Sequence, residues 1–64
     1  MQDYQQRVVT EKEDLDIKRT KLDTFLDTPK FFDLDIPEQS RLKHQSEVMR
    51  TYSIILGERI AAFK

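Results

Sequence analysis

Two long stretches without a helix breaker, separated by a short segment that holds both prolines, limit what this chain can fold into. Within each stretch, apolar residues recur every seven positions, a spacing that places them along one side of an α-helix. These rows are Val8, Leu15 and Leu22 in the first stretch, and Leu42, Met49, Leu56 and Phe63 in the second. The sequence therefore predicts an all-α fold, an antiparallel hairpin of two helices.

We expect a single domain over residues 1–64, with helices at about 3–27 and 36–63 and a short helical turn at 29–34. Proline disfavours helical geometry in the residue before it, so Pro29 should end the first helix. A short connection between two long helices favours an antiparallel arrangement.

Capping patterns mark the expected helix starts. Asp3 is followed three residues later by Gln6, and Asp35 by Glu38, which is the spacing of a capping box. Thr28 is a candidate cap for the short turn. These residues set the predicted element boundaries.

A second row should complete the seam of each helix: Tyr4, Glu11, Lys18 and Phe25 in the first, and Gln45, Tyr52 and Arg59 in the second. A register that faces Leu15 toward Leu56 brings Glu11 near Arg59 and Lys18 near Tyr52. We predict a Glu11–Arg59 ion pair and favour mutual satisfaction of these polar groups. The alternative is a site in which an aromatic ring stacks on a base and a cation meets a phosphate.

A chain this short should be only marginally stable on its own. It has 64 residues, no cysteine and one histidine, which excludes disulfides, thiolate zinc and a multi-histidine metal site within one chain. An outer apolar set also lies off the seam: Val9, Ile17, Leu26 and Ile54. We therefore predict a homo-oligomer. Gly57 within the second helix is either tolerated at a cost or allows close approach of another backbone.

Composition excludes several function classes. Eleven basic and twelve acidic residues give a net charge of −1, which disfavours duplex nucleic acid as a partner. No apolar run suits a membrane span and no signal peptide begins the chain, so we expect a cytoplasmic location without a membrane partner. A single glycine excludes a P-loop, and His44 has no nucleophile partner. We expect no enzyme activity, no catalytic residue, no metal and no cofactor.

Two motifs carry a family resemblance, R-V-x-x-E-K-x-x-L-x-x-K-x-x-K-L-x-x-F from Arg7 and Q-x-x-x-M-x-x-Y-x-x-x-L-x-x-R-I from Gln45. With the linking PKFFDL they cover almost the whole chain, which resembles the phage anti-CBASS and anti-Thoeris hairpin-domain family of cyclic-nucleotide sponges. The resemblance implies compact hexamers. These would bind cyclic dinucleotides, cyclic trinucleotides or cyclic ADP-ribose isomers between protomers, without cleavage, in the cytoplasm of an infected bacterial host.

The resemblance also implies site residues. An aromatic near the N-terminus, here Tyr4, would stack on a base, and Lys18 or Arg19 would hold phosphate with help from the Thr20 hydroxyl. Arg59, in the closing R-I pair, would reach a second type of pocket. With Arg7 from beside the seam, the candidate ligand-binding residues are Tyr4, Arg7, Lys18, Arg19, Thr20 and Arg59.

Two other functions remain open. The outer apolar residues Val9, Ile17 and Ile54 could make the hairpin an adaptor or inhibitor that docks on a host protein. The chain could also be a purely structural coiled-coil hairpin without a ligand.

Overall fold

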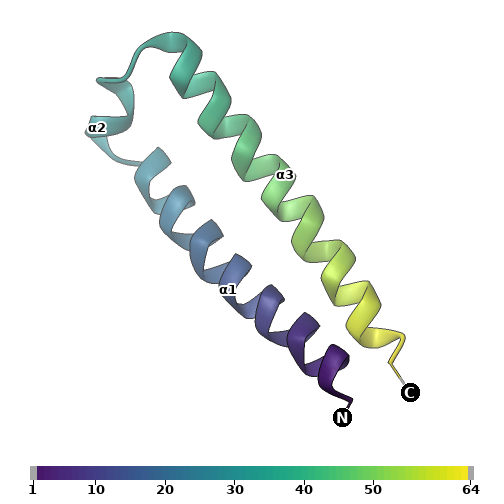
Figure 1. Ribbon diagram of the computed structural model, residues 1–64. Coiled ribbons are helices and arrows are strands. Elements are labelled where there is room, and N and C mark those ends of the chain that lie inside the picture. The colour runs from purple at the N-terminus through teal and green to yellow at the C-terminus, as the bar shows by residue number, and fades with distance from the viewer. Residues whose placement is uncertain (1, 64) are drawn as a thin grey trace.

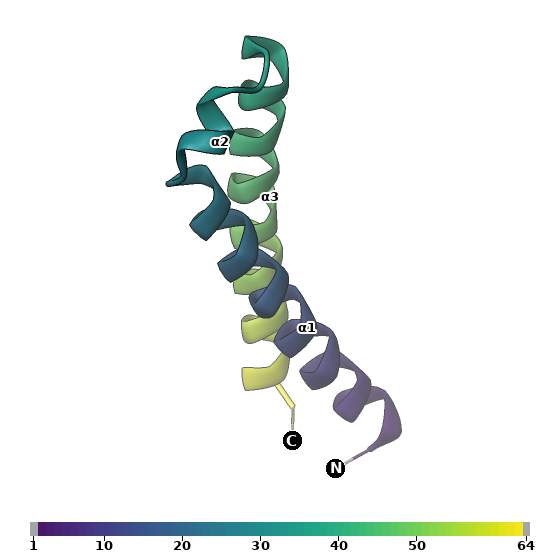
Figure 2. The same cartoon turned by 90° about the vertical axis from the view of Figure 1, so that its left-hand side faces the viewer.

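The computed structural model describes residues 2–63, which form a rod of 47 × 14 × 13 Å (Figure 1). Helix α1 spans Asp3–Leu26, the short helix α2 spans Pro29–Phe32, and α3 spans Ile36–Ala61. The two long helices pack antiparallel, so the start of α1 and the end of α3 share one end of the rod. Figure 2 shows that they are inclined to each other. The predicted all-α hairpin with a helical turn at the bend is confirmed.

The start of α1 differs from the prediction. Gln2 is the N-cap, and its backbone N–H donates a hydrogen bond of 2.8 Å to Oε1 of Gln5. The capping box predicted for Asp3 and Gln6 is therefore wrong by one residue, because Asp3 is already helical.

The other two predicted caps occupy the right positions but act differently. Thr28 and Asp35 are the N-caps of α2 and α3, and neither side chain makes a capping hydrogen bond, so the predicted Asp35–Glu38 box does not form. Thr28 Oγ1 instead donates to the backbone oxygen of Phe25 at 2.7 Å. The threonine thus closes the last turn of α1. The second long helix ends at Ala61, short of the predicted 63.

The apolar core follows the first predicted row of each helix. Val8, Leu15 and Leu56 are buried in one cluster, with Leu56 wholly inaccessible to solvent, and Met49, Ile60 and Phe63 pack against it. Leu15 and Leu56 meet as the predicted register requires. At the bend, Phe31 of α2 is buried and packs edge-on against Phe25 of α1, with ring centroids 6.2 Å apart.

The second predicted row is wrong by one residue in both helices except at Phe25, which is half-buried and packs against Phe31. In α1, Tyr4, Glu11 and Lys18 are exposed, while Gln5 is buried and Lys12 and Arg19 are half-buried. In α3, Gln45, Tyr52 and Arg59 are exposed, while Ser53 is buried and Ser46 and Ile60 are half-buried. The seam therefore combines an apolar row with a largely polar one.

Polar contacts across the seam explain this shift. Lys12 Nζ donates to Ser53 Oγ at 3.0 Å, and Ser53 Oγ donates to Asp16 Oδ1 at 2.6 Å. Nearer the bend, Ser46 Oγ donates to Asp23 Oδ1 at 2.5 Å. Hydrogen-bonded polar side chains therefore lie in the seam at positions where the heptad pattern predicts larger side chains.

The predicted Glu11–Arg59 ion pair is wrong. No such pair forms within residues 2–63, and both side chains are exposed. The physical reason is the shifted seam, which places Lys12 rather than Glu11 between the helices.

The predicted outer apolar set divides into two pairs. Ile17 and Ile54 are each 55% exposed, whereas Val9 and Leu26 are half-buried. Within the part of the chain that the structure describes, no helix has both the length and the apolar character that crossing a bilayer requires.

Gly57 faces a side chain and not a backbone. A Cβ built on Gly57 would lie 3.4 Å from Cε of Lys12, at ordinary contact distance from a flexible side chain. Gly57→Ala should therefore raise the free energy of unfolding by about 1 kcal/mol through helix propensity, as measured by urea denaturation. A loss of stability would show that this position needs the space that glycine leaves.

Candidate ligand-binding groove

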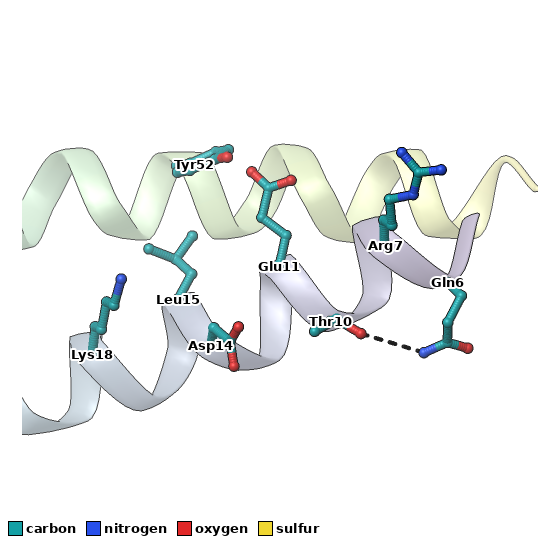
Figure 3. A pocket seen from close by; sticks show the side chains of 8 residues that line it. All are labelled: Gln6, Arg7, Thr10, Glu11, Asp14, Leu15, Lys18 and Tyr52. Carbon is teal, nitrogen blue, oxygen red and sulfur yellow. Dashed lines mark hydrogen bonds between the residues drawn. The ribbon is translucent and has the colours of Figure 1, made fainter. Parts of the chain in front are cut away.

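An open groove of about 560 Å³ lies along α1 beside Tyr52 of α3 (Figure 3). Leu15 lies between the two helices in the groove, and charged side chains of α1 stand on either side of it along the helix. We call this feature the Tyr52 groove. It is lined by Gln6, Arg7, Thr10, Glu11, Asp14, Leu15, Lys18 and Tyr52.

Helical spacing places the charged residues of the groove on one face. Arg7, Glu11 and Lys18 are separated by four and seven residues, about one and two turns of helix. The shifted seam keeps this row beside the helix contact and not within it. The row therefore stays exposed while Leu15, in the adjacent row, is buried.

The groove has two kinds of wall. In Figure 3, Arg7, Glu11 and Lys18 extend toward the side on which Tyr52 lies, and Glu11 stands between Arg7 and Tyr52. Asp14, Gln6 and Thr10 form the outer rim, where Gln6 Nε2 donates to Thr10 Oγ1 at 3.4 Å. Two cations and two carboxylates thus surround one aromatic ring and one aliphatic side chain.

Of the six predicted site residues, the structure brings Arg7 and Lys18 together in the Tyr52 groove. Lys18 and Tyr52 share it as the predicted register requires, although no hydrogen bond joins them within residues 2–63. Tyr4 lies outside, 59% exposed, with its ring edge-on to Phe63 at a centroid distance of 5.9 Å. Arg59 is exposed on α3 and does not line the groove.

Arg19 and Thr20 belong to a different surface. Arg19 donates to Asp16 Oδ1 at 3.1 Å, and the Thr20 hydroxyl donates to the backbone oxygen of Asp16 at 2.9 Å. Thr20 lines a shallow apolar hollow with Asp16, Ile17 and Lys21. Arg19 Nε is buried without a hydrogen-bond partner. The structure therefore separates these two residues from Lys18.

Comparison with known proteins adds family membership to this geometry. The family model for Sequestin matches residues 2–62. This chain belongs to the Sequestin family. It is also 39% identical, over 61 residues that cover 95% of each chain, to the "Uncharacterized 7.5 kDa protein in denB-rIIB intergenic region" of Enterobacteria phage T4. No solved structure matches significantly.

Among residues 2–63 of this Sequestin chain, the most strongly bonded ionisable group is Asp16, which lies outside the groove. Asp16 accepts from Lys12 at 2.8 Å, as well as from Ser53 and Arg19. The bond from Lys12, then that from Ser53, lowers the pKa of Asp16 to about 2, with a smaller contribution from Arg19. Lys12 and Arg19 thus hold the carboxylate within α1, and Ser53 ties it to α3.

This low pKa predicts a dependence of stability on acid. Because the fold favours ionised Asp16, its contribution is complete above about pH 4 and is lost as the pH falls toward 2. Urea denaturation at pH 5, 3 and 2 should show that wild type has a higher free energy of unfolding than Asp16→Asn at pH 5, and that this advantage shrinks as the pH falls. An advantage that stays constant down to pH 2 would contradict the bonding described for Asp16.

Several groove residues of this Sequestin chain carry no distinctive sequence pattern. Gln6, Thr10 and Asp14 line the outer rim, and Glu11 was assigned to an ion pair. Their only sequence signal is spacing by three and four residues, which any exposed helix face shares.

Proposed function

We propose that this protein is a phage-type anti-defence protein that binds and sequesters cyclic oligonucleotide immune signals without cleaving them. The observation that carries the proposal is the placement of Arg7 and Lys18 in a groove beside the ring of Tyr52. Aromatic side chains stack on bases, and Lys and Arg hold phosphates. Cyclic dinucleotides, and by extension cyclic trinucleotides, combine both features. The family name Sequestin and the phage origin of the 39% identical relative agree with this role.

We infer further that the functional sites form between protomers of a homo-oligomer. Val48, Tyr52 and Ile55 recur at helical spacing along α3 and are 52%, 41% and 47% exposed. A second copy seated on this stripe would bury it and close the open side of the Tyr52 groove. A hexamer is the assembly that we favour, from the family resemblance.

The remaining predicted residues fit the same proposal. Tyr4 presents an exposed ring one turn from Arg7 and would stack on a base from another protomer. Arg19 is the alternative cation for a phosphate, with the Thr20 hydroxyl beside it, and Arg59 would reach a second type of pocket between copies. The proposed location is the cytoplasm of the infected host, where such signals are made and sensed.

Isothermal titration calorimetry tests the proposal directly. Purified oligomer titrated with a panel of cyclic dinucleotides and cyclic trinucleotides should bind at least one of them with a Kd near the nanomolar range, roughly −12 kcal/mol. Chromatography after overnight incubation should recover the ligand intact. Absence of binding heat with every member of the panel would exclude the proposal, as would sedimentation as a monomer at micromolar concentration.

The second candidate is an adaptor or inhibitor that docks on a host protein. Its support is the exposure of Ile17 and Ile54, which lie outside the Tyr52 groove. Ile17→Asp separates the two functions in a phage-infection assay. If protection of the phage is lost while cyclic nucleotide affinity and assembly are unchanged, the adaptor function is correct. If protection persists, the apolar docking surface is not needed.

A further inference from the structure

We propose that Glu11 makes the Tyr52 groove selective for guanine over adenine among the bases of cyclic dinucleotides. The inference rests on the proposed function, because it names the base that the same groove accepts. It begins from a feature that phosphate binding does not explain, namely a carboxylate standing among the cations of the site.

Glu11 is available to a ligand. Its side chain is exposed, and it makes no hydrogen bond or ion pair with another side chain within residues 2–63. The neighbouring Lys12 is already engaged by Asp16 and Ser53, at 2.8 and 3.0 Å, on the seam side of α1. Glu11 extends instead toward the space between Arg7 and Tyr52 (Figure 3).

The negative charge of Glu11 restricts which ligands the groove accepts. Arg7 and Lys18 are balanced by Glu11 and Asp14, so the groove is formally neutral. When the two phosphates of a ligand pair with Arg7 and Lys18, the Glu11 carboxylate loses its counter-charges. This is unfavourable unless another part of the ligand donates hydrogen bonds to Glu11. Asp14 lies on the outer rim and stays solvated, whereas Glu11 faces the groove. The edge of the base must therefore donate hydrogen bonds to the Glu11 carboxylate.

Guanine is the purine that meets this requirement. Its N1–H and N2 amino group are adjacent donors on one edge, which matches the two oxygens of a carboxylate. Adenine presents one amino donor beside the N1 acceptor, and this lone pair would face the carboxylate. Hydrogen bonds to a charged group are stronger than neutral ones, so the mismatch carries a larger cost than a simple missing contact.

The spacing of the groove agrees with this pose. Glu11 and Lys18 are seven residues apart, about 10 Å along the helix axis. A base stacked on Tyr52 above Leu15 would direct its edge toward Glu11 and its phosphate toward Lys18. One nucleotide thus bridges the carboxylate and the cation.

The test compares three ligands on the assembled protein by calorimetry: cyclic di-GMP, cyclic di-IMP, which lacks the 2-amino groups, and cyclic di-AMP. Wild type should bind cyclic di-GMP at least tenfold more tightly than cyclic di-AMP, with cyclic di-IMP between them. Glu11→Gln replaces one acceptor oxygen by a donor and should reduce the preference below threefold. Glu13→Gln, at an exposed position that does not line the groove, is the matched control and should keep the wild-type ratio.

The inference would be overturned, with the proposed function left intact, by equal affinity of wild type for cyclic di-GMP and cyclic di-AMP. A preference for cyclic di-GMP that survives Glu11→Gln would overturn it in the same way. Failure of all three ligands and of the cyclic trinucleotides would instead remove the proposed function, and the inference with it. A loss of preference in Glu13→Gln equal to that in Glu11→Gln would also overturn it, because the effect would then be general electrostatics.

Discussion

Lys18→Ala is expected to weaken cyclic dinucleotide binding about 100-fold. Lys18 is an exposed cation of the Tyr52 groove, and it makes no ion pair within residues 2–63 that would divert it from a phosphate. A hydrogen bond to a charged group contributes about 1.5–3 kcal/mol, and 1.4 kcal/mol corresponds to a factor of ten. Calorimetry with the tightest ligand of the panel measures the loss.

Lys21→Ala is the matched control for this experiment. Lys21 is exposed on the same helix, three residues further on, but lines the shallow hollow beside Ile17 and Thr20. The Lys21→Ala substitution removes the same charge as Lys18→Ala and should change the affinity for the ligand less than threefold. Lys18→Arg should restore most of the binding. Equal losses in Lys18→Ala and Lys21→Ala would mean that net charge, and not the groove, controls the affinity.

Leu56→Ala should cost about 2–5 kcal/mol of stability, enough to unfold much of the protein. Leu56 is wholly buried and joins Val8 and Leu15 in the core cluster. A hydrophobic core in a chain of this size supplies only about 3–5 kcal/mol, so one cavity removes most of it. Circular dichroism during urea denaturation at fixed protein concentration gives the change.

The adjacent Ile55→Ala provides the comparison. Ile55 is 47% exposed in the hairpin, so its truncation should cost less than about 1 kcal/mol when copies are dilute. At higher concentration the cost should grow, because the proposed assembly covers the Val48–Tyr52–Ile55 stripe. A cost for Leu56→Ala as small as that for Ile55→Ala would contradict the position of Leu56 in the core.

The fold was predictable because its strongest determinants are local. The row through Leu15 and the row through Leu56 define one face of each helix, and Pro29 separates them. The partner row was wrong because the apolar pattern favours Tyr4 and Tyr52, whereas the seam uses Lys12 and Ser53. Hydrogen bonds between residues 41 positions apart leave no periodic signal in the sequence.

The site was predictable only in part for the same reason. Arg7 and Lys18 were selected as polar residues at or beside the seam, and both line the groove. Arg19 was selected as an alternative phosphate ligand, but Asp16 engages it. Which neighbouring cation stays free depends on how α1 is rotated about its axis, and that rotation is decided by tertiary contacts.

The hydrogen bonds that join Lys12, Asp16 and Ser53 also fix the register of α1 against α3. Heptad rows alone tolerate a displacement of one helix along the other, since each apolar side chain would meet a similar neighbour. A shift of one turn, about 5.4 Å, would carry Ser53 beyond the reach of Asp16 and bring Met49 or Gly57 to its place, and neither has a side-chain donor for the carboxylate. The hydrogen bonds of Ser53 therefore hold the adjacent Tyr52 in alignment with the charged face of α1.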